Sequence, residues 1–165
     1  MSTLYYINVS THLFAALLWL GGMFFLAVVG APVLRLVDPP SLRRDLFSRI
    51  GEQFRLVGWI AIAVLLVTGV GNLYFRGILT SGLLASAAFW SGSYGKALIV
   101  KLAAVLFMLV VQAVHDFVHG PRSGRLDPGT EEGRKARRTA AWLGRLNAVA
   151  GVVVVLAAVR LARGG

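Results

Sequence analysis

The chain contains no cysteine, and it has only three methionines and three histidines among its 165 residues. The absence of cysteine excludes disulfide bonds, iron–sulfur clusters, thiolate metal sites and covalent haem attachment through a Cys-x-x-Cys-His motif. Any metal would need imidazole, thioether, amine, phenol or carboxylate ligands instead. Acidic residues are also scarce, with 7 against 17 basic ones, and the net charge is +10.

Sequence motifs of common soluble enzymes are missing as well. The chain has no serine-based triad pattern, no glycine-rich phosphate loop and no Walker motif. It also lacks a pair of carboxylates within its apolar runs, where two acids could share a reaction. These absences disfavour hydrolase and ATPase functions.

Apolar residues are abundant: they make up 57% of the chain, and the mean hydropathy is +0.73. A soluble domain of this length would not bury so much apolar surface, which indicates a membrane protein. Four runs are long enough to cross about 30 Å of hydrocarbon, for which about 20 residues suffice. The sequence thus predicts an all-α integral membrane protein, one domain over 1–165 that forms a four-transmembrane-helix bundle with spans near 7–30, 54–75, 97–118 and 140–160.

The basic residues predict the orientation of this bundle. Twelve of the 17 cluster in the connections after the first and third runs: Arg35, Arg43, Arg44, Arg49, Arg55, Arg122, Arg125, Arg134, Lys135, Arg137, Arg138 and Arg145. By the positive-inside rule these connections face the cytoplasm, so both termini are expected outside. Because these charges flank apolar runs and do not cover one soluble face, we expect no nucleic acid partner.

Three connections carry further patterns. Leucine and isoleucine recur every four residues among arginines over 41–52, which predicts an amphipathic helix on the inner membrane surface. The segment 77–93 has few charges and is expected to form a short helix or loop over the outer mouth of the bundle. The segment 120–138 is rich in glycine, proline and charge, and we predict a mobile loop there.

Ionisable residues within a span are costly and usually face the bundle interior, so they are the first candidates for function. At 1.5 Å per residue, His12 and Lys101 both fall roughly 10 Å below the outer interface, in helices that run the same way. Thr68 and Asn72 approach the same layer. The simpler alternatives are that His12 only bonds a neighbouring helix and that Lys101 extends upward to water.

A stripe of residues continues from His12 along the first span through Ala16, Trp19 and Met23. Small residues beside the histidine, including Gly22, would leave volume that a flat macrocycle could use. Bundle interiors commonly hold cofactors between facing helices.

Polar residues also gather at the inner face. His115 and His119 are spaced i, i+4, which places two imidazoles on one side of a helix and is compatible with an alternative inner metal site. Without a third ligand of known position, a solvated interfacial cluster is the simpler interpretation. The residues near the same depth are Gln112, Asp116, Arg145 and Asn147.

The chain resembles the copper-resistance D (CopD) family of membrane proteins over roughly residues 8–120. The similarity rests on His12, Trp19-Leu20-Gly21-Gly22, Phe47-Ser48, Thr68-Gly69-Val70 and Tyr94-Gly95-Lys96-Ala97-Leu98-Ile99-Val100-Lys101-Leu102. It is more distantly similar to the HemJ group of membrane protoporphyrinogen oxidases, through His12 before Trp-x-Gly-Gly and through Lys101. The first resemblance implies copper movement across the membrane, often beside a periplasmic copper protein, and the second implies b-type haem and a redox reaction.

From these features we expect a haem-b-binding bundle protein in membrane electron transfer or oxidation, in which a haem-dependent oxidoreductase activity is one option. His12 would be the first axial ligand, and Lys101 in its neutral form would be the second or would pair with a propionate. Trp19, Thr68 and Asn72 would line the cofactor site. The alternative is copper transport, with the copper ion held at His12, Met23, Met108 and the inner histidine pair.

The expected location is the bacterial plasma membrane, as a multi-pass protein in contact with the lipid bilayer. We expect a redox partner or a periplasmic metal-binding protein as a further contact, and a homo-oligomer is compatible with the sequence. A third possibility is an accessory subunit without metal, in which Lys101 pairs with a partner's carboxylate.

Overall fold

The computed structural model describes residues 3–119, 126 and 129–164, which form helices and no β-strand. Four helices in this part of the chain are long and apolar enough to cross a membrane, which confirms the predicted all-α membrane bundle. The first span comprises α1 (Thr3–Phe25), a π-helical segment η1 (Leu26–Gly30) and α2 (Ala31–Leu34). The other spans are α3 (Pro40–Phe75), α5 (Ser93–Val114) with its π-helical extension η3 (His115–His119), and α7 (Glu131–Ala162).

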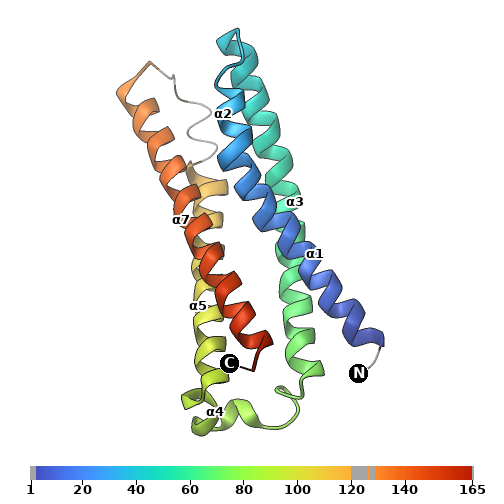
Figure 1. Ribbon diagram of the computed structural model, residues 1–165. Helices are drawn as coiled ribbons and strands as arrows, with labels where there is room; N and C mark the ends of the chain where they lie inside the picture. The colour runs from blue at the N-terminus through green and yellow to red at the C-terminus, as the bar shows by residue number, and fades with distance from the viewer. Residues whose placement is uncertain (1–2, 120–125, 127–128, 165) are drawn as a thin grey trace.

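The four spans form two antiparallel pairs (Figure 1). α1 packs along α3, and α5 packs along α7. The beginning of α1 and the end of α7 lie at the same end of the molecule as the short helix α4 (Ala87–Ser91). We call this the termini end. The opposite end, where α3 and α7 begin, is called the arginine-rich end.

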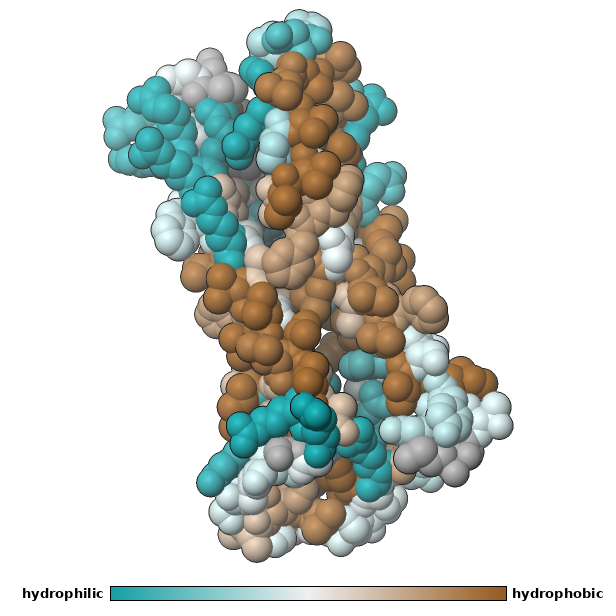
Figure 2. Space-filling model, viewed as in Figure 1, coloured by the Kyte–Doolittle hydropathy of each residue, from teal (hydrophilic) through white to brown (hydrophobic). Residues whose placement is uncertain are grey.

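The helices are longer than the hydrocarbon layer requires. At about 1.5 Å per residue, the 32 residues of the first span measure about 48 Å and the 36 residues of α3 about 54 Å, against a layer of about 30 Å. Figure 2 shows a predominantly apolar middle with hydrophilic surface gathered toward both ends. Large apolar side chains such as Phe14, Val67 and Leu106 remain at least 64% exposed, as expected for residues that face lipid tails.

Residues 41–52 are helical, as predicted, but they do not form a separate helix. These residues form the first turns of α3, which runs without interruption from Pro40 to Phe75. Pro40 occupies the first helical position, where proline loses no helical hydrogen bond, and no further proline follows within the helix. The arginines of this segment therefore extend the second span beyond the apolar layer.

The predicted loop over 120–138 needs a similar correction. Helix α7 already begins at Glu131, so the last part of that segment is helical. Thr130 caps this helix, since its hydroxyl accepts a hydrogen bond from the Gly133 amide at 3.1 Å. Two acidic residues in the first turn, Glu131 and Glu132, also favour a helix start here. Residues 120–125 and 127–128 lie outside the part of the chain that the structure describes.

The expected short helix within 77–93 is present. It consists of a 3-10 turn, η2 (Leu83–Ala85), followed by α4. Trp90 anchors this connection by donating its indole hydrogen to the Leu84 carbonyl at 2.9 Å. Gly95 allows α5 to begin close to α4, because a Cβ there would overlap the Phe89 carbonyl oxygen.

One apolar cluster joins the four spans in the middle of the bundle. Its buried members are Trp19, Ala61, Ile62, Met108 and Ala150. Glycines permit the close helix contacts around this cluster: a Cβ on Gly151 would stand 2.7 Å from Leu20, and one on Gly22 would overlap the ring of Phe54. Because lipid provides no hydrophobic drive for helix association, such close packing contributes much of the stability.

Candidate functional site

The candidate site nearest the termini end is built around His12 of α1. Its ring nitrogen Nδ1 lies 2.7 Å from the hydroxyl oxygen of Thr68, which is a buried residue of α3. A Cβ on Gly69 would come within 3.7 Å of the His12 ring, so the imidazole lies directly against this turn of α3. The structure therefore brings His12 and Thr68 together, from opposite members of one helix pair.

The bonds of Thr68 define which ring nitrogen of His12 carries hydrogen. A hydroxyl has one hydrogen, and Thr68 directs its Oγ1 toward the Val64 carbonyl at 2.6 Å. With its hydrogen on Val64, the same oxygen accepts from His12, and this arrangement favours Nδ1 as the protonated nitrogen. Nε2 of His12 is left with a lone pair, the arrangement that metal-binding histidines commonly show.

Asn8 completes this layer, and the sequence prediction had not included it. Its amide donates to the Thr68 carbonyl at 3.0 Å and to the side-chain oxygen of Asn72 at 2.9 Å. Gly71 makes room for the Asn8 side chain, since a Cβ there would lie 2.5 Å from its amide oxygen. The signal in the sequence is the i, i+4 spacing of Asn8 and His12, which places both on one face.

Two cations lie near this polar layer. Lys101 of α5 is partly buried and close enough for its charge to act on His12. The charge of Arg76, at the end of α3, acts in turn on Lys101. Arg76 also donates to the carbonyl of Leu161 at 3.2 Å and so connects α3 to the end of α7. This layer therefore combines one neutral ligand nitrogen with positive charge nearby.

Trp19 does not share this layer. It is 5% exposed and packs in the apolar cluster in the middle of the bundle, next to Gly58 of α3. The volume that was expected to stay open at Gly22 is occupied by the chain itself, because the ring of Phe54 fills it. A flat macrocycle there would have to displace this side chain.

A second polar cluster lies toward the arginine-rich end, centred on Asp116 of η3. The carboxyl oxygen Oδ2 accepts from the Trp59 indole at 3.0 Å and from the Gln112 amide at 2.8 Å. The other oxygen, Oδ1, lies 3.0 Å from Nδ1 of His115. Asp116 is only 7% exposed. It lies in a π-helical segment, a distortion that is frequent at functional sites.

Hydrogen bonds extend this cluster to two more spans. The Asn147 amide of α7 donates to Gln112 at 2.8 Å, and the same nitrogen lies 3.5 Å from the Met23 sulfur of α1. We call the six residues together the Asp116 cluster: Met23, Trp59, Gln112, His115, Asp116 and Asn147. The sequence placed Gln112, Asp116 and Asn147 at one depth. The contributions of Trp59 and Met23 were missed, because helix rotation decides which residues face the interior.

The surroundings of the inner histidine pair differ from those of His12. His115 faces Asp116, as described, and Arg145, which shares this depth, is exposed. Across the described residues there is no group of three or more histidine and acidic side chains that could hold a metal ion. The proposed roles of His115 and His119 as metal ligands stay a prediction.

Comparisons with known proteins relate the chain to a family. Residues 48–161 match the family model of CopD, copper resistance protein D. An uncharacterized protein of Aquifex aeolicus (strain VF5) is 29% identical over 154 residues, which cover 93% of this chain and 92% of that protein. No solved structure matches the chain. The matched range includes Thr68 and Lys101 but not His12.

Proposed function

The chain belongs to the copper resistance protein D family, and from this premise we propose that it moves copper across the membrane through its four-helix bundle. Copper is here the transported substrate. The reduced ion, Cu(I), suits the ligands that the chain offers, because thioethers select it and imidazole also binds copper.

One observation supports this proposal most: His12 lies within the bundle below the termini end with Nδ1 against the Thr68 hydroxyl, an arrangement that favours a lone pair on Nε2. Thr68 holds the opposite ring nitrogen at 2.7 Å and thereby fixes both tautomer and ring orientation. A hydrogen bond to the other ring nitrogen raises the affinity of a histidine ligand for its metal. We propose His12 as the copper ligand closest to the termini end. Thr68 orients it, and Asn72 holds the layer through Asn8.

Two methionines supply the next ligands. Met23 follows His12 on the same face of the first span, about 16 Å further along at 1.5 Å per residue. Met108 of α5 is fully buried in the central cluster. Met23 contacts Asn147, and Met108 lies against Gly151 one turn further along α7. Both thioethers thus lie against neighbouring turns of α7, which supports a second copper station between His12 and the arginine-rich end.

Haem b gains less support than copper. Phe54 fills the space at Gly22 on the His12 face of the first span, and Trp19 belongs to the packed core. A macrocycle that extends from His12 toward Met23 would have to displace these side chains. The HemJ resemblance, electron transfer and an oxidoreductase activity stay predictions, as does Lys101 as an iron ligand.

We further propose that the protein resides in a bacterial plasma membrane with its arginine-rich end in the cytoplasm. Its chain forms one membrane domain, and a periplasmic metal-binding protein would deliver or accept copper at the termini end. The distribution of arginine supports this orientation, because basic residues near spans favour the cytoplasmic side.

Cu(I) binding by the purified protein in lipid nanodiscs tests the proposal. The parent protein, His12→Ala and His119→Ala would be titrated against a coloured Cu(I) chelator, and a visible absorption spectrum would be recorded from each preparation. We expect the parent to remove Cu(I) from the chelator and His12→Ala to lose at least one bound ion. His119→Ala, a matched histidine change at the other end, should keep full occupancy.

Copper transport would then be measured in vesicles that contain the same variants. Copper uptake by the parent and its loss in His12→Ala would support the proposal. A parent protein that neither binds nor moves copper would overturn it. A reducible Soret band that His12→Ala removes would instead favour haem.

A further inference from the structure

The acidic residues of the chain gather at one end of the bundle. Those that the structure describes lie toward the arginine-rich end, before or early in α3, in η3 or at the start of α7: Asp38, Asp45, Glu52, Asp116, Glu131 and Glu132. The five basic residues outside the arginine-rich connections lie toward the termini end: Arg76, Lys96, Lys101, Arg160 and Arg163. Among the described residues, no acidic side chain balances these five. An anion from outside the chain would therefore be attracted to this end.

A groove at the termini end contains one of these cations, Arg76. The groove has a volume of about 560 Å³, and Arg76 alone is charged among the described residues that line it. One wall is formed by Tyr5 and Phe75, whose ring centroids are 6.0 Å apart, and the other by Phe89 and Tyr94, at the same separation. The two walls belong to different helix pairs, because Tyr5 and Phe75 come from α1 and α3, and Phe89 and Tyr94 from α4 and α5.

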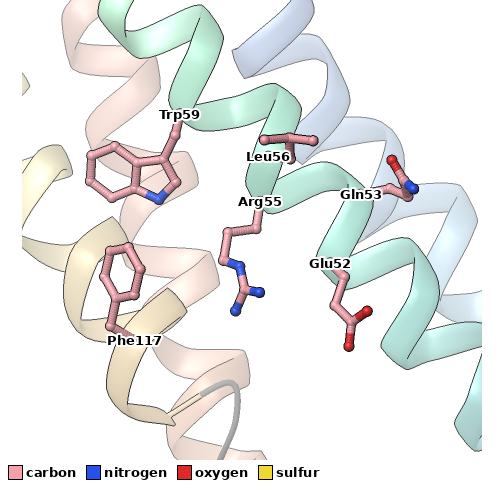
Figure 3. A pocket seen from close by; sticks show the side chains of 6 residues that line it. All are labelled: Glu52, Gln53, Arg55, Leu56, Trp59 and Phe117. Carbon is pink, nitrogen blue, oxygen red and sulfur yellow. The ribbon is translucent and has the colours of Figure 1, made fainter.

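The groove at the arginine-rich end differs in its charges. It has a volume of about 410 Å³ and is lined by Glu52, Gln53, Arg55, Leu56, Trp59 and Phe117. Figure 3 shows that its cation, Arg55, shares the groove with the acidic side chain of Glu52. The groove at the termini end presents Arg76 without such a counter-charge. The comparison favours an anionic ligand at the termini end and gives no such reason at the other end.

Arg76 has hydrogen-bond donors available for a ligand. A guanidinium group carries five N–H donors, and Nη1 of Arg76 donates to the Leu161 carbonyl at 3.2 Å. The side chain is exposed and lines the groove, so its other donors can reach a molecule bound there. Its charge also acts on Lys101, a second cation of this end. A phosphate group suits this position, because arginine binds two phosphate oxygens at once.

The walls of the groove indicate what else the ligand contains. A free phosphate ion would leave the aromatic rings and the side chains of Ile78 and Leu83 uncovered, whereas an acyl chain would remove them from water. Tyr5 and Tyr94 place the groove at head-group level, because tyrosine is enriched at the membrane interface. A lipid phosphate lies at this level as well. The unbalanced basic residues favour a lipid with a net negative charge over a zwitterionic one.

We propose that the groove at the termini end binds an anionic phospholipid, with its phosphate on Arg76 and an acyl chain against the aromatic walls. This inference goes beyond the copper function and does not depend on it. Because the walls come from both helix pairs, the bound lipid holds the pairs together at this end. The hydrogen bond from Arg76 to Leu161 joins them at the same place.

Native mass spectrometry of the full chain in a neutral detergent tests this site. The protein would be titrated with phosphatidylglycerol or with phosphatidylcholine of the same acyl chains. We expect the parent to prefer phosphatidylglycerol. Arg76→Gln should bind this lipid about fivefold more weakly, the factor expected for one basic residue at an anionic surface. Its affinity for phosphatidylcholine should change less, whereas loss of the Leu161 bond alone would weaken both lipids alike.

Arg160→Gln is the matched control for charge. Arg160 is exposed in the last turn of α7 and does not line the groove, so this variant should keep the parent's preference. Equal affinity for phosphatidylglycerol in Arg76→Gln and Arg160→Gln would overturn the site. A parent without preference between the two lipids would overturn it as well.

Leu83→Gln tests the apolar wall and decides the matter if Arg76→Gln does not fold. Leu83 lies in the 3-10 turn before α4 and is 41% exposed, so the change leaves the packed core intact. Both lipids should bind more weakly to this variant, because a polar side chain replaces part of the surface that the acyl chain covers. Unchanged lipid affinity would contradict the placement of the acyl chain.

Thermal unfolding of the parent in phosphatidylcholine nanodiscs distinguishes other anions. Including phosphatidylglycerol in the nanodiscs should raise the melting temperature, because a ligand that binds the folded state stabilises it. Inorganic phosphate or a polyglutamate peptide, added to phosphatidylcholine nanodiscs, should not. Stabilisation by inorganic phosphate would assign the groove to a free anion, and stabilisation by polyglutamate would assign it to an acidic protein. Either result would overturn the lipid assignment.

Discussion

Nδ1 of His12 and the hydroxyl oxygen of Thr68 lie 2.7 Å apart, and this contact joins α1 to α3 in the layer near the termini end. Thr68 passes its own hydrogen to the Val64 carbonyl one turn earlier. The hydroxyl therefore acts as an acceptor for the imidazole. A change at residue 68 should alter the ligand properties of residue 12 without touching the ligand itself.

Thr68→Val should weaken Cu(I) binding at His12 by about 10- to 100-fold, the range found when a metal-binding histidine loses the hydrogen-bond partner of its other nitrogen. Valine has the shape of threonine but cannot accept from Nδ1, so the ring can rotate or adopt the other tautomer. Thr68→Ser keeps the hydroxyl and should bind copper close to the parent level. Chelator competition measures both variants, and equal affinity in Thr68→Val and Thr68→Ser would contradict the role of this bond.

Lys101→Leu should strengthen Cu(I) binding by about tenfold, which corresponds to about 1.4 kcal/mol. The Lys101 charge acts on the His12 region, and a positive charge disfavours a bound cation. Leucine removes the charge without adding a copper ligand. Lys96→Leu is the matched control, since Lys96 is exposed in the first turn of the same helix. Weaker binding in Lys101→Leu, with Lys96→Leu unchanged, would indicate that the amine itself is a ligand.

The spans and the polar layer at His12 were predictable from the sequence, for related reasons. An apolar run of about 20 residues is long enough to cross the lipid layer, so each span can be recognised by itself. Residues spaced i, i+4 on a helix, such as Thr68 and Asn72, lie on the same face. Depth below the interface follows from residue counting, which placed His12 near Lys101. These features depend on one helix at a time and need no knowledge of how helices rotate against each other.

The Asp116 cluster could not be predicted in this way, because it depends on contacts between different helices. Its bonds join residues 57 and 124 positions apart, Trp59 to Asp116 and Met23 to Asn147. Which side of each helix faces inward is decided by close packing at glycines such as Gly151. The continuous α3 was missed because an amphipathic pattern describes a surface helix and a helix extension equally well. Only the absence of a breaker after Pro40 separates the two.

Gly22→Val should lower the melting temperature of the detergent-solubilised protein, whereas Gly21→Val should not. A Cβ on Gly22 would overlap the Phe54 ring, which lies at the contact between α1 and α3. A Cβ on Gly21 has nothing within 4 Å. Both changes alter helix propensity equally, so their difference isolates the packing term, of about 1–3 kcal/mol for an overpacked contact. Equal melting temperatures would show that Phe54 can move aside at little cost.

The absence of cysteine makes the orientation of the bundle directly measurable with single-cysteine variants. Ser41 lies exposed in the first turn of α3 at the arginine-rich end, and Ser81 lies exposed in the connection before α4 at the termini end. Both positions tolerate a small side chain because neither is buried. A maleimide that cannot cross membranes reports which of them faces the outside of an intact cell.

In intact bacterial cells we expect Ser81→Cys to react with this maleimide and Ser41→Cys to react only after the membrane is permeabilised. The reason is the concentration of arginine at the end that carries Ser41, because cytoplasmic connections collect basic residues. The parent chain, which has no thiol, should give no signal and serves as the blank. The opposite labelling pattern would invert the orientation. In that case His12 would lie below the cytoplasmic surface, and copper would first meet the Asp116 cluster from the outer side.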